Sequence, residues 1–245
     1  MASVHFILQG KGGVGKSLVA SMLVQFLRTK TDESLVHCID TDPVNQTLAG
    51  YKEFNAESLN ILRDEVIDER SFDKLMEIIF GLPDEDHLVI DNGASSFVPL
   101  CAYLTENQAI GLLKDAGHTV YMHSVITGGQ AIQDTLRSLR LLFDNAGFKA
   151  AEIVTWLNHY FGEVEMNGSR FEDFQIYRDF SERFRALIEI PHRKQSTFGR
   201  DLEGVLAEKI SFEAAIHSTR SIMERQRLKS WWAAACEVME LAHFV

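Results

Sequence analysis

Short apolar runs with β-branched residues alternate along this chain with longer segments in which apolar residues recur at helical spacing. The runs predict strands at residues 4–9, 35–40, 87–91, 119–126, 151–157 and 186–190. The helical spacing predicts helices at residues 16–30, 70–80, 106–116, 129–146 and 170–185, and a last helix from about Thr219. This alternation favours an α/β fold, a mostly parallel sheet with helices on both faces. No repeat or linker interrupts it, so we expect a single domain spanning residues 1–245.

Composition indicates a globular protein of ordinary polarity. The chain has 245 residues, of which 46% are hydrophobic and 24% charged, and its net charge of −11 disfavours broad, non-specific binding to DNA or anionic lipid. The sequence contains no run of about 18 apolar residues, the length needed to span a membrane. The apolar run at residues 4–9 is expected to be a strand and not part of a signal peptide. We therefore expect a cytoplasmic protein whose three separated cysteines, Cys38, Cys101 and Cys236, are buried free thiols.

A glycine-rich loop follows the first predicted strand. Its sequence is Gly10-Lys11-Gly12-Gly13-Val14-Gly15-Lys16-Ser17, which fits the phosphate-binding pattern G-x-x-x-x-G-K-[ST] and lies between a predicted strand and a predicted helix. The glycines let backbone N–H groups face phosphate oxygens, and the N-terminus of the next helix favours an anion. Lys16 is expected to reach the β- and γ-phosphates, and the Ser17 hydroxyl to bind Mg²⁺. The sequence thus predicts a site for ATP or ADP with Mg²⁺.

Two later predicted strands end in carboxylates. Asp40 and Asp42 follow the second strand, and because strand residues alternate sides, both can point the same way. Leu88-Val89-Ile90-Asp91 is a hydrophobic strand ending in aspartate, the Walker B pattern, so Asp91 is expected to hold the water shell of Mg²⁺. Ligands gather at the carboxyl ends of parallel strands. A carboxylate pair after a strand is also common as a turn or helix cap, so the pair alone leaves both interpretations open.

Taken together, these segments resemble the deviant Walker A ATPases of the ParA/MinD family. The resemblance rests on Lys11 near the start of the loop and on the Asp-x-Asp-Pro segment at residues 40–43. It implies that ATP closes a sandwich homodimer in which Lys11 reaches across to the partner's nucleotide. By the same resemblance, Asp42 positions or activates the attacking water and Asp40 lies in the Mg²⁺ shell. The implied catalytic set is Lys11, Lys16 and Asp42, and the implied metal set is Ser17, Asp40 and Asp91.

Other positions follow or depart from that family. Asn158 ends a late predicted strand and matches the asparagine that the family uses for adenine; a turn-initiating asparagine is the other interpretation. Leu18 departs from the family, in which many members carry a hydroxyl for the α-phosphate. Residues 92–96 are the expected switch segment for the γ-phosphate but lack the usual proline. No arginine finger can be assigned, so we expect slow turnover, as in an ATP-timed switch.

Longer stretches resemble the TraL family of conjugal transfer proteins from IncP-type plasmids and related mobile elements. They include residues 8–17, 39–45, 90–100, 127–131, 199–201 and 225–229, and so reach nearly the whole chain. The segment after Asp91 is the more specific part, because general ParA proteins do not share it. This resemblance implies a cytoplasmic ATPase of the conjugative transfer apparatus, with relaxosome or secretion-channel components as partners.

Three further interpretations stay open. Residues 178–200 carry six Lys and Arg side chains against three Asp and Glu, so a plasmid-partitioning ATPase could bind DNA there, although a solvated face has the same pattern. A metabolic ATP-dependent ligase or kinase on the same scaffold would need a substrate pocket at the strand ends. The last predicted helix has an apolar stripe preceded by basic residues, which could lie on the inner membrane or pack on the protein's own core.

The remaining candidates are weaker. Residues 159–183 are expected to form an insertion over the nucleotide or a partner surface. His123, His159 and His192 have no metal-ligand spacing and are expected to be structural. Cys101 lacks a suitably placed second cysteine, which disfavours an iron–sulfur reductase.

Overall fold

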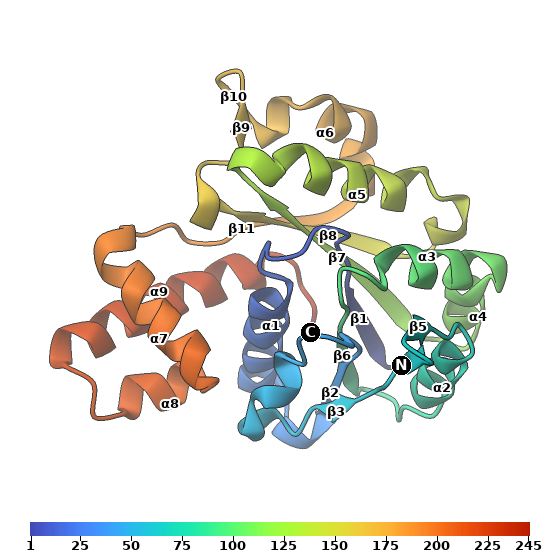
Figure 1. Ribbon diagram of the computed structural model, residues 1–245, viewed down its shortest axis with the longest axis horizontal. Helices are drawn as coiled ribbons and strands as arrows, with labels where there is room; N and C mark the ends of the chain where they lie inside the picture. Colours follow the sequence, from blue (N-terminus) through green and yellow to red (C-terminus); the bar gives the residue numbers. More distant parts are fainter.

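The computed structural model describes residues 1–245 and centres on a seven-stranded sheet (Figure 1). The strand order is β11-β8-β7-β1-β6-β2-β3, and all neighbours are parallel. These strands are β1 (Ser3–Ile7), β2 (Val36–Asp40), β3 (Glu57–Ser58), β6 (His87–Asp91), β7 (Thr119–Thr127), β8 (Glu152–Asn158) and β11 (Phe184–Glu189). Parallel neighbours need crossover connections, and helices supply most of them here. The predicted α/β class is confirmed.

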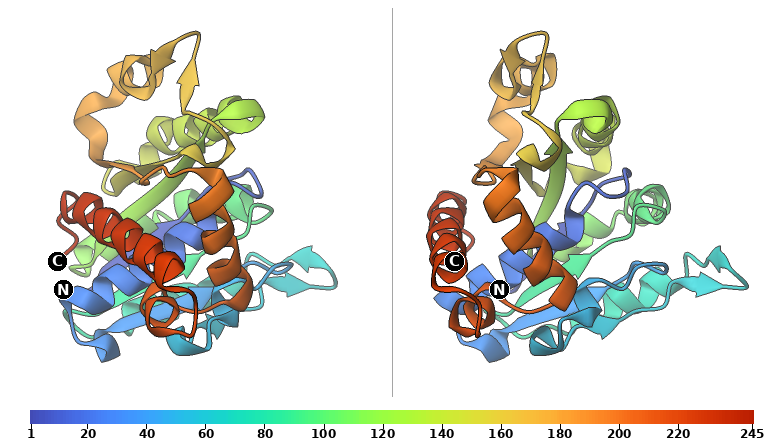
Figure 2. Two further views of the ribbon diagram at one scale, coloured as in Figure 1. Left: turned by 90° about the vertical axis from the view of Figure 1, so that its left-hand side faces the viewer. Right: turned by 60° about the vertical axis from the view of Figure 1, so that its left-hand side comes forward.

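Nine α-helices cover the two faces of this sheet (Figures 1 and 2). They are α1 (Lys16–Lys30), α2 (Ser71–Phe80), α3 (Phe97–Glu106), α4 (Ala109–Asp115), α5 (Ile132–Asp144), α6 (Gln175–Phe180), α7 (Arg200–Glu208), α8 (Phe212–His217) and α9 (Ile222–Glu240). Helices α1, α7, α8 and α9 pack on one face, and α2 to α6 pack on the other. No helix is long and apolar enough to cross a membrane.

Two apolar cores result from the alternation of side chains along the strands. Phe6 and Ile7 are consecutive in β1 and fully buried, yet they belong to opposite cores. Both cores contain the same number of buried residues, 32, so neither face of the central strands meets water. That double burial explains why these strands read as continuous apolar runs in the sequence and not as alternating ones.

The apolar stripe of the last helix packs on the protein's own core. Leu228, Trp231, Ala235 and Met239 of α9 are all buried, and the Trp231 indole N–H donates to the Pro191 carbonyl at 2.6 Å. These four residues of the stripe are therefore covered by the protein itself, whereas Ile222 and Met223 in the first turn of α9 stay exposed. Of the two interpretations of that helix, packing on the core is confirmed.

Six predicted strands and most predicted helices are present, with ends shifted by a few residues. The helix expected at residues 170–185 is wrong over most of its length, because only α6 is α-helical and Phe184 already begins β11. Its last two residues belong to the edge strand β11, whose backbone pairs with β8. The helix expected at 106–116 is shorter, since Gln108 has a φ of 50° and separates α4 from α3, a helix that the pattern did not predict.

Two small antiparallel hairpins project from the molecule (Figure 2). They are β4 (Leu62–Arg63) with β5 (Val66–Ile67), and β9 (Glu165–Met166) with β10 (Ser169–Arg170). The second lies in the segment 159–183, whose Phe171, Phe174 and Ile176 pack into the core on the α5 side. Cys38 and Cys101 are buried as expected, Cys236 is half-buried, and all three are free thiols.

Candidate nucleotide site

The glycine-rich loop, residues 10–17, connects β1 to α1 at the carboxyl edge of the sheet. Gly13 and Gly15 have φ values of 74° and 102°, which other residues adopt only with strain. A side chain at position 15 would also collide with Asn158, whose Nδ2 lies 2.7 Å from the position of a Cβ. Helix α1 begins at Lys16 with no side-chain cap on its first N–H groups. These donors therefore remain available to an anion.

Lys16 lies inside this loop and is only 8% exposed. Its Nζ donates to the Lys11 carbonyl at 3.2 Å, so the ammonium is held within the ring of the loop. Burial lowers the pKa of Lys16, and the nearby carboxylates of Asp91 and Asp42 oppose that shift. A buried cation next to carboxylates and free N–H groups is suited to hold a phosphate chain.

Asp40 and Asp91 end two adjacent strands and are paired in register. Asp40 is engaged by backbone: Oδ1 accepts from the Asp42 N–H at 3.0 Å and Oδ2 from the Ala49 N–H at 3.1 Å. Burial raises its pKa in spite of these bonds. In Asp91, by contrast, Oδ2 is buried without any hydrogen-bond partner.

That difference appears in the ionisation of Asp91. Burial raises its pKa to about 7, the nearby Ser17 hydroxyl and Lys16 ammonium lower it, and the Asp40 carboxylate raises it further. An orphaned, buried carboxylate oxygen beside a serine hydroxyl fits the water shell of Mg²⁺. No three His, Cys, Asp or Glu side chains are grouped to hold a metal alone. Mg²⁺ characteristically takes one or two carboxylates and completes its shell with phosphate and water.

Asp42 lies in the loop after β2 and lines the cleft beside Lys16. Its Oδ1 accepts from the backbone N–H groups of Val44 at 2.9 Å and Asn45 at 3.0 Å. No hydrogen bond within the protein reaches its Oδ2. Asp40 therefore fixes the loop after β2, whereas Asp42 lines the cleft, and that the two carboxylates point the same way stays a prediction.

Lys11 points away from this cleft within its own chain. Its Nζ pairs with the Asp134 carboxylate of α5 at 3.0 Å, and both side chains are close to half-exposed. The resemblance to the ParA/MinD family places this lysine at the nucleotide of a second chain, and the structure describes one chain. The observed pair holds Lys11 on the surface beside the loop.

Asn158 braces the loop. Its Nδ2 donates to the Val14 carbonyl at 2.9 Å, and its Oδ1 accepts from the Tyr160 N–H at 3.1 Å. One amide hydrogen and one oxygen lone pair remain for another partner. The adenine contact of Asn158 stays a prediction, and the bond to Val14 is a role that the sequence did not indicate.

Two further polar groups that support the site escaped the sequence interpretation. Gln9 is fully buried, with Nε2 donating to the Val125 carbonyl at 2.8 Å and Oε1 accepting from the Lys11 N–H at 3.4 Å. Asn92 is also fully buried, and its Oδ1 accepts from the hydroxyls of Thr41 and Ser96. The only sequence signal for either is a polar residue directly after an apolar strand.

Lys16, Ser17 and Asp42 line a cleft of about 560 Å³, within the range of small-ligand sites. Its lining comes from the glycine loop, the loop after Asp42, the turn after β6 and α7, and comprises Gly12, Gly13, Gly15, Lys16, Ser17, Leu18, Asp42, Val44, Asn45, Thr47, Tyr51, Ala94, Ser95 and Leu206. The segments 42–47 and 92–96 therefore meet at the same cleft as Lys16. This is the placement expected of a segment that senses a γ-phosphate.

The other sequence candidates lie elsewhere. His123 is fully buried, accepts from the Trp156 indole N–H at 3.0 Å, and has its pKa lowered by burial to about 3, so it is structural. His159 is buried and accepts from the Val164 N–H at 3.2 Å, whereas His192 is exposed.

In the basic segment 178–200, four of the six cations already contact the protein itself. Arg178 pairs with Asp173, and three arginines donate to backbone carbonyls: Arg183 to Phe143, Arg185 to His243 and Arg193 to His192. The free basic surface of this segment is therefore smaller than the sequence suggested.

Comparison with known proteins places these features in context. No family model matches the chain. Two curated proteins of Escherichia coli, each named Protein TraL, are 45% identical to it over 230 residues, which cover 94% of this chain and 93% of theirs. Among solved structures, a chain of the MinC:MinD cell division protein complex of Aquifex aeolicus has a TM-score of 0.52 and 13% identity, with 95% of this chain and 96% of that chain covered. The likeness to that chain is one of fold.

Proposed function

The chain belongs to the TraL family, and from this premise we propose that it is an ATP-binding, slowly ATP-hydrolysing molecular switch that acts in conjugative DNA transfer. The observation that carries the proposal is a cleft lined by the buried Lys16, Ser17 and Asp42 at the start of an uncapped helix, with the buried Asp91 close enough to Lys16 to oppose the lowering of its pKa. Cation, free N–H groups and carboxylates at one edge of a parallel sheet suit a nucleoside triphosphate with Mg²⁺. The whole chain, residues 1–245, acts in this proposal as a single domain.

The residues present fit a bound Mg²⁺, which would supply charge neutralisation across the β- and γ-phosphates. Ser17 would ligate it, and Asp91, whose Oδ2 has no other partner, would hold its water shell together with Asp40. Lys16 would bind the terminal phosphates from within the loop. Backbone N–H groups of residues 12–17 would complete the cradle.

Hydrolysis requires a water placed in line with the γ-phosphate and charge neutralisation around it. In this proposal Asp42 positions that water through Oδ2, since its Oδ1 is occupied by two backbone N–H groups. Transfer of the γ-phosphoryl group to water yields ADP and inorganic phosphate. No arginine reaches the cleft, and its lining contains Lys16 as the sole cation, so turnover is slow.

An exposed apolar side chain at the cleft supports an ATP-dependent homodimer. Val44 lines the cleft and is 76% exposed, so a second copy could cover it. Lys11 would exchange Asp134 for the nucleotide of that second copy. Both partners of this ion pair are close to half-exposed and screened by water, so the exchange is easily driven.

Sedimentation velocity of two Asp42 variants tests the dimer. Asp42→Asn keeps an oxygen for the Val44 and Asn45 N–H groups, whereas Asp42→Ala removes it. Both should bind Mg-ATP without hydrolysing it, and Asp42→Asn should accumulate as a dimer with Mg-ATP but not with ADP. If Asp42→Asn stays monomeric under saturating Mg-ATP, the dimer is excluded.

The setting in conjugation is tested separately in donor cells that lack this protein. Plasmid transfer should fall without it, and the wild-type chain should restore transfer whereas Lys16→Ala should not. Restoration by Lys16→Ala at an equal protein level would remove the link between nucleotide and transfer.

A further inference from the structure

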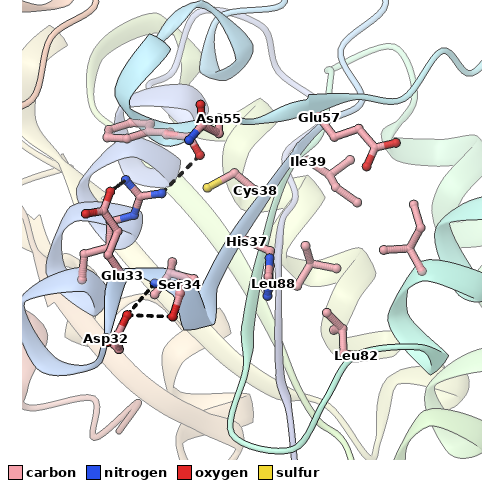
Figure 3. Close-up of a pocket in the computed structure, with 14 residues that line it drawn as sticks. Asp32, Glu33, Ser34, His37, Cys38, Ile39, Asn55, Glu57, Leu82 and Leu88 are labelled. Carbon is pink, nitrogen blue, oxygen red and sulfur yellow. Dashed lines mark hydrogen bonds and ion pairs between the residues drawn. The ribbon is translucent and has the colours of Figure 1, made fainter.

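A second cleft, of about 630 Å³, lies at the amino end of β2, away from the glycine loop (Figure 3). It lies beside the part of β2 that precedes the first residue of β3. Strand β3 pairs with β2 only at Ile39 and Asp40. Upstream of β3 the chain leaves the sheet at Asn55, which has a φ of 51° and follows the short helical turn Lys52–Phe54. The outer edge of β2 therefore has no neighbouring strand along Val36–Cys38, and the space there is wide enough for one. We name this space the β2-edge groove.

The backbone of β2 presents hydrogen-bonding groups to this groove. The Thr41 N–H donates to the Asp91 carbonyl at 2.9 Å, so odd-numbered residues of β2 face β6. The Leu59 N–H donates to the Asp40 carbonyl at 2.9 Å, so even-numbered residues face the outer edge. Val36 and Cys38 thus aim their backbone groups into the groove.

Two of these backbone groups lack a partner. The Val36 N–H already donates to the Glu33 carbonyl, and the Cys38 carbonyl lies against the start of β3. The Val36 carbonyl and the Cys38 N–H have no hydrogen bond within the protein. Both residues line the groove and have only 3% and 5% of their surface exposed. One extended residue opposite His37, running parallel to β2, would satisfy both groups.

The walls of the groove come from both faces of the sheet. Cys38 and Phe54 belong to the core on the α1 side, whereas Ile39 and Leu88 belong to the opposite core, with Leu82 packed against it. Figure 3 shows Cys38 on one side of β2 and Ile39, Leu82 and Leu88 on the other. A strand places successive side chains on opposite faces, so both walls would be used by alternate residues of one extended segment.

Charge indicates the composition of that segment. Asp32, Glu33 and Glu57 line the groove, and Arg28 is already committed to Glu33 at 2.6 Å and to the Phe54 carbonyl. The stretch 57–86, which contributes the wall beyond β2, carries ten Asp and Glu against three Lys and Arg. Its net charge of −7 is more than half of the −11 of the whole chain.

We propose that the β2-edge groove receives an extended basic segment of a partner polypeptide, which joins the sheet as a short strand in line with β3. Main-chain hydrogen bonds to Val36 and Cys38 would provide affinity, and apolar residues on alternate positions would enter the two walls. Flanking lysines or arginines would meet Asp32 and Glu57. This site goes beyond the proposed ATPase function and does not depend on nucleotide.

Fluorescence anisotropy with a synthetic peptide tests the site on the intact protein. The probe has about nine residues, with valine and threonine alternating in the centre and lysines at both ends. One matched peptide carries glutamate in place of lysine, and another has its central backbone nitrogens methylated. We expect saturable binding of the first peptide and at least about tenfold weaker binding of each matched peptide.

Amide hydrogen exchange locates the peptide. Binding should slow exchange at the Cys38 N–H, which has no partner in the free protein. If the methylated peptide binds equally well, or if Cys38 exchange does not change, the segment does not join the sheet and the proposal fails. Protection of Cys38 that grows with protein concentration in the absence of peptide would assign the groove to a second copy of this chain and equally overturn the proposal.

A charge-reversal pair separates the groove from general attraction. Glu57 lines the groove, whereas Glu237 is exposed on α9, and each change to lysine alters the net charge equally. Glu57→Lys should weaken the peptide about tenfold, and Glu237→Lys less than about twofold. Equal weakening by both variants, or no binding of the lysine peptide to the wild-type protein, would overturn the proposal.

Discussion

The two ends of strand β2 make a useful contrast. At its carboxyl end, Asp40 is held by two backbone N–H groups, and the loop beyond it closes around a polar cleft. At its amino end, the Val36 carbonyl and the Cys38 N–H are left without partners beside an apolar groove of similar size. One end is equipped for an anion with a cation, and the other for an extended backbone. In our two proposals, a single strand thus contributes to sites for two different kinds of ligand.

The contrast predicts that changes at one end leave the other unaffected. The largest effect is expected from Lys16→Ala, which removes the buried cation of the carboxyl end. ATP hydrolysis should fall by about 100-fold or more, because a preorganised charge at a transferring phosphoryl group is lost. Steady-state phosphate release measures this. Affinity for the lysine peptide should be unchanged, and a parallel loss of both activities would break the contrast.

Asp91→Asn should stabilise the protein in the absence of Mg²⁺ and nucleotide. Burial raises the pKa of Asp91 to about 7. As the pH rises above 3.8, the ordinary pKa of this carboxyl group, the unfolded state loses a proton that the folded state keeps until about pH 7. Asp91 therefore costs almost no stability near pH 4 and its full penalty near pH 8, where Asp91→Asn should gain up to about 4 kcal/mol, because the pKa is raised from 3.8 to about 7. Urea unfolding at the two pH values measures the gain.

Asp40→Asn is the control for that experiment, since Asp40 sits in the adjacent strand but accepts two backbone N–H groups. It should show no gain at pH 8, because the asparagine NH2 donates and would face one of these two N–H groups without accepting from it. A gain from Asp91→Asn that does not depend on pH would show that the buried charge is not its cause.

Asn158→Ala tests whether Asn158 contacts the adenine base, as the family resemblance implies, or only supports the glycine-rich loop. It removes the hydrogen bond to the Val14 carbonyl, worth about 1 kcal/mol, so ATP affinity should fall several-fold. Competition binding with ATP and GTP separates two explanations. If Asn158 also contacts adenine, the preference for ATP over GTP disappears; if it only braces the loop, both affinities fall together.

Asp134→Asn should have the smallest effect. It removes the ion pair with Lys11, in which both partners are close to half-exposed, so the urea concentration at the midpoint of unfolding should not change measurably. Urea unfolding at low salt is the measurement. A clear drop in that midpoint would show that this pair holds the glycine loop in place in the single chain.

The candidate nucleotide cleft at the carboxyl end of β2 could be predicted from the sequence, because its residues lie in short, recognisable sequence segments. Glycines, Lys16 and Ser17 are contiguous, and Asp40 and Asp91 each end an apolar run, so short patterns located them. Parallel pairing then brought the strand ends together, as the alternation of strands and helices implied. The fold class followed from the same alternation.

The groove at the amino end of β2 could not be predicted, because it exists only where the neighbouring strand β3 is absent. No residue pattern announced that β3 would contain only Glu57 and Ser58, and Val36–Cys38 reads as an ordinary buried strand. The support of the loop by Gln9 and Asn158 was missed for a similar reason. Each of these side chains hydrogen-bonds a backbone carbonyl that is more than 100 residues away, and a sequence pattern does not reveal such a contact.

Calorimetric titration of ATP into the wild-type protein and into Lys16→Ala, each with and without Mg²⁺, tests the central claim most directly. The account predicts saturable binding of one nucleotide per chain to the wild type, stronger with Mg²⁺, and no detectable binding to Lys16→Ala. Equal binding by both proteins, or no binding by the wild type, would contradict the assignment of the carboxyl-end cleft to ATP.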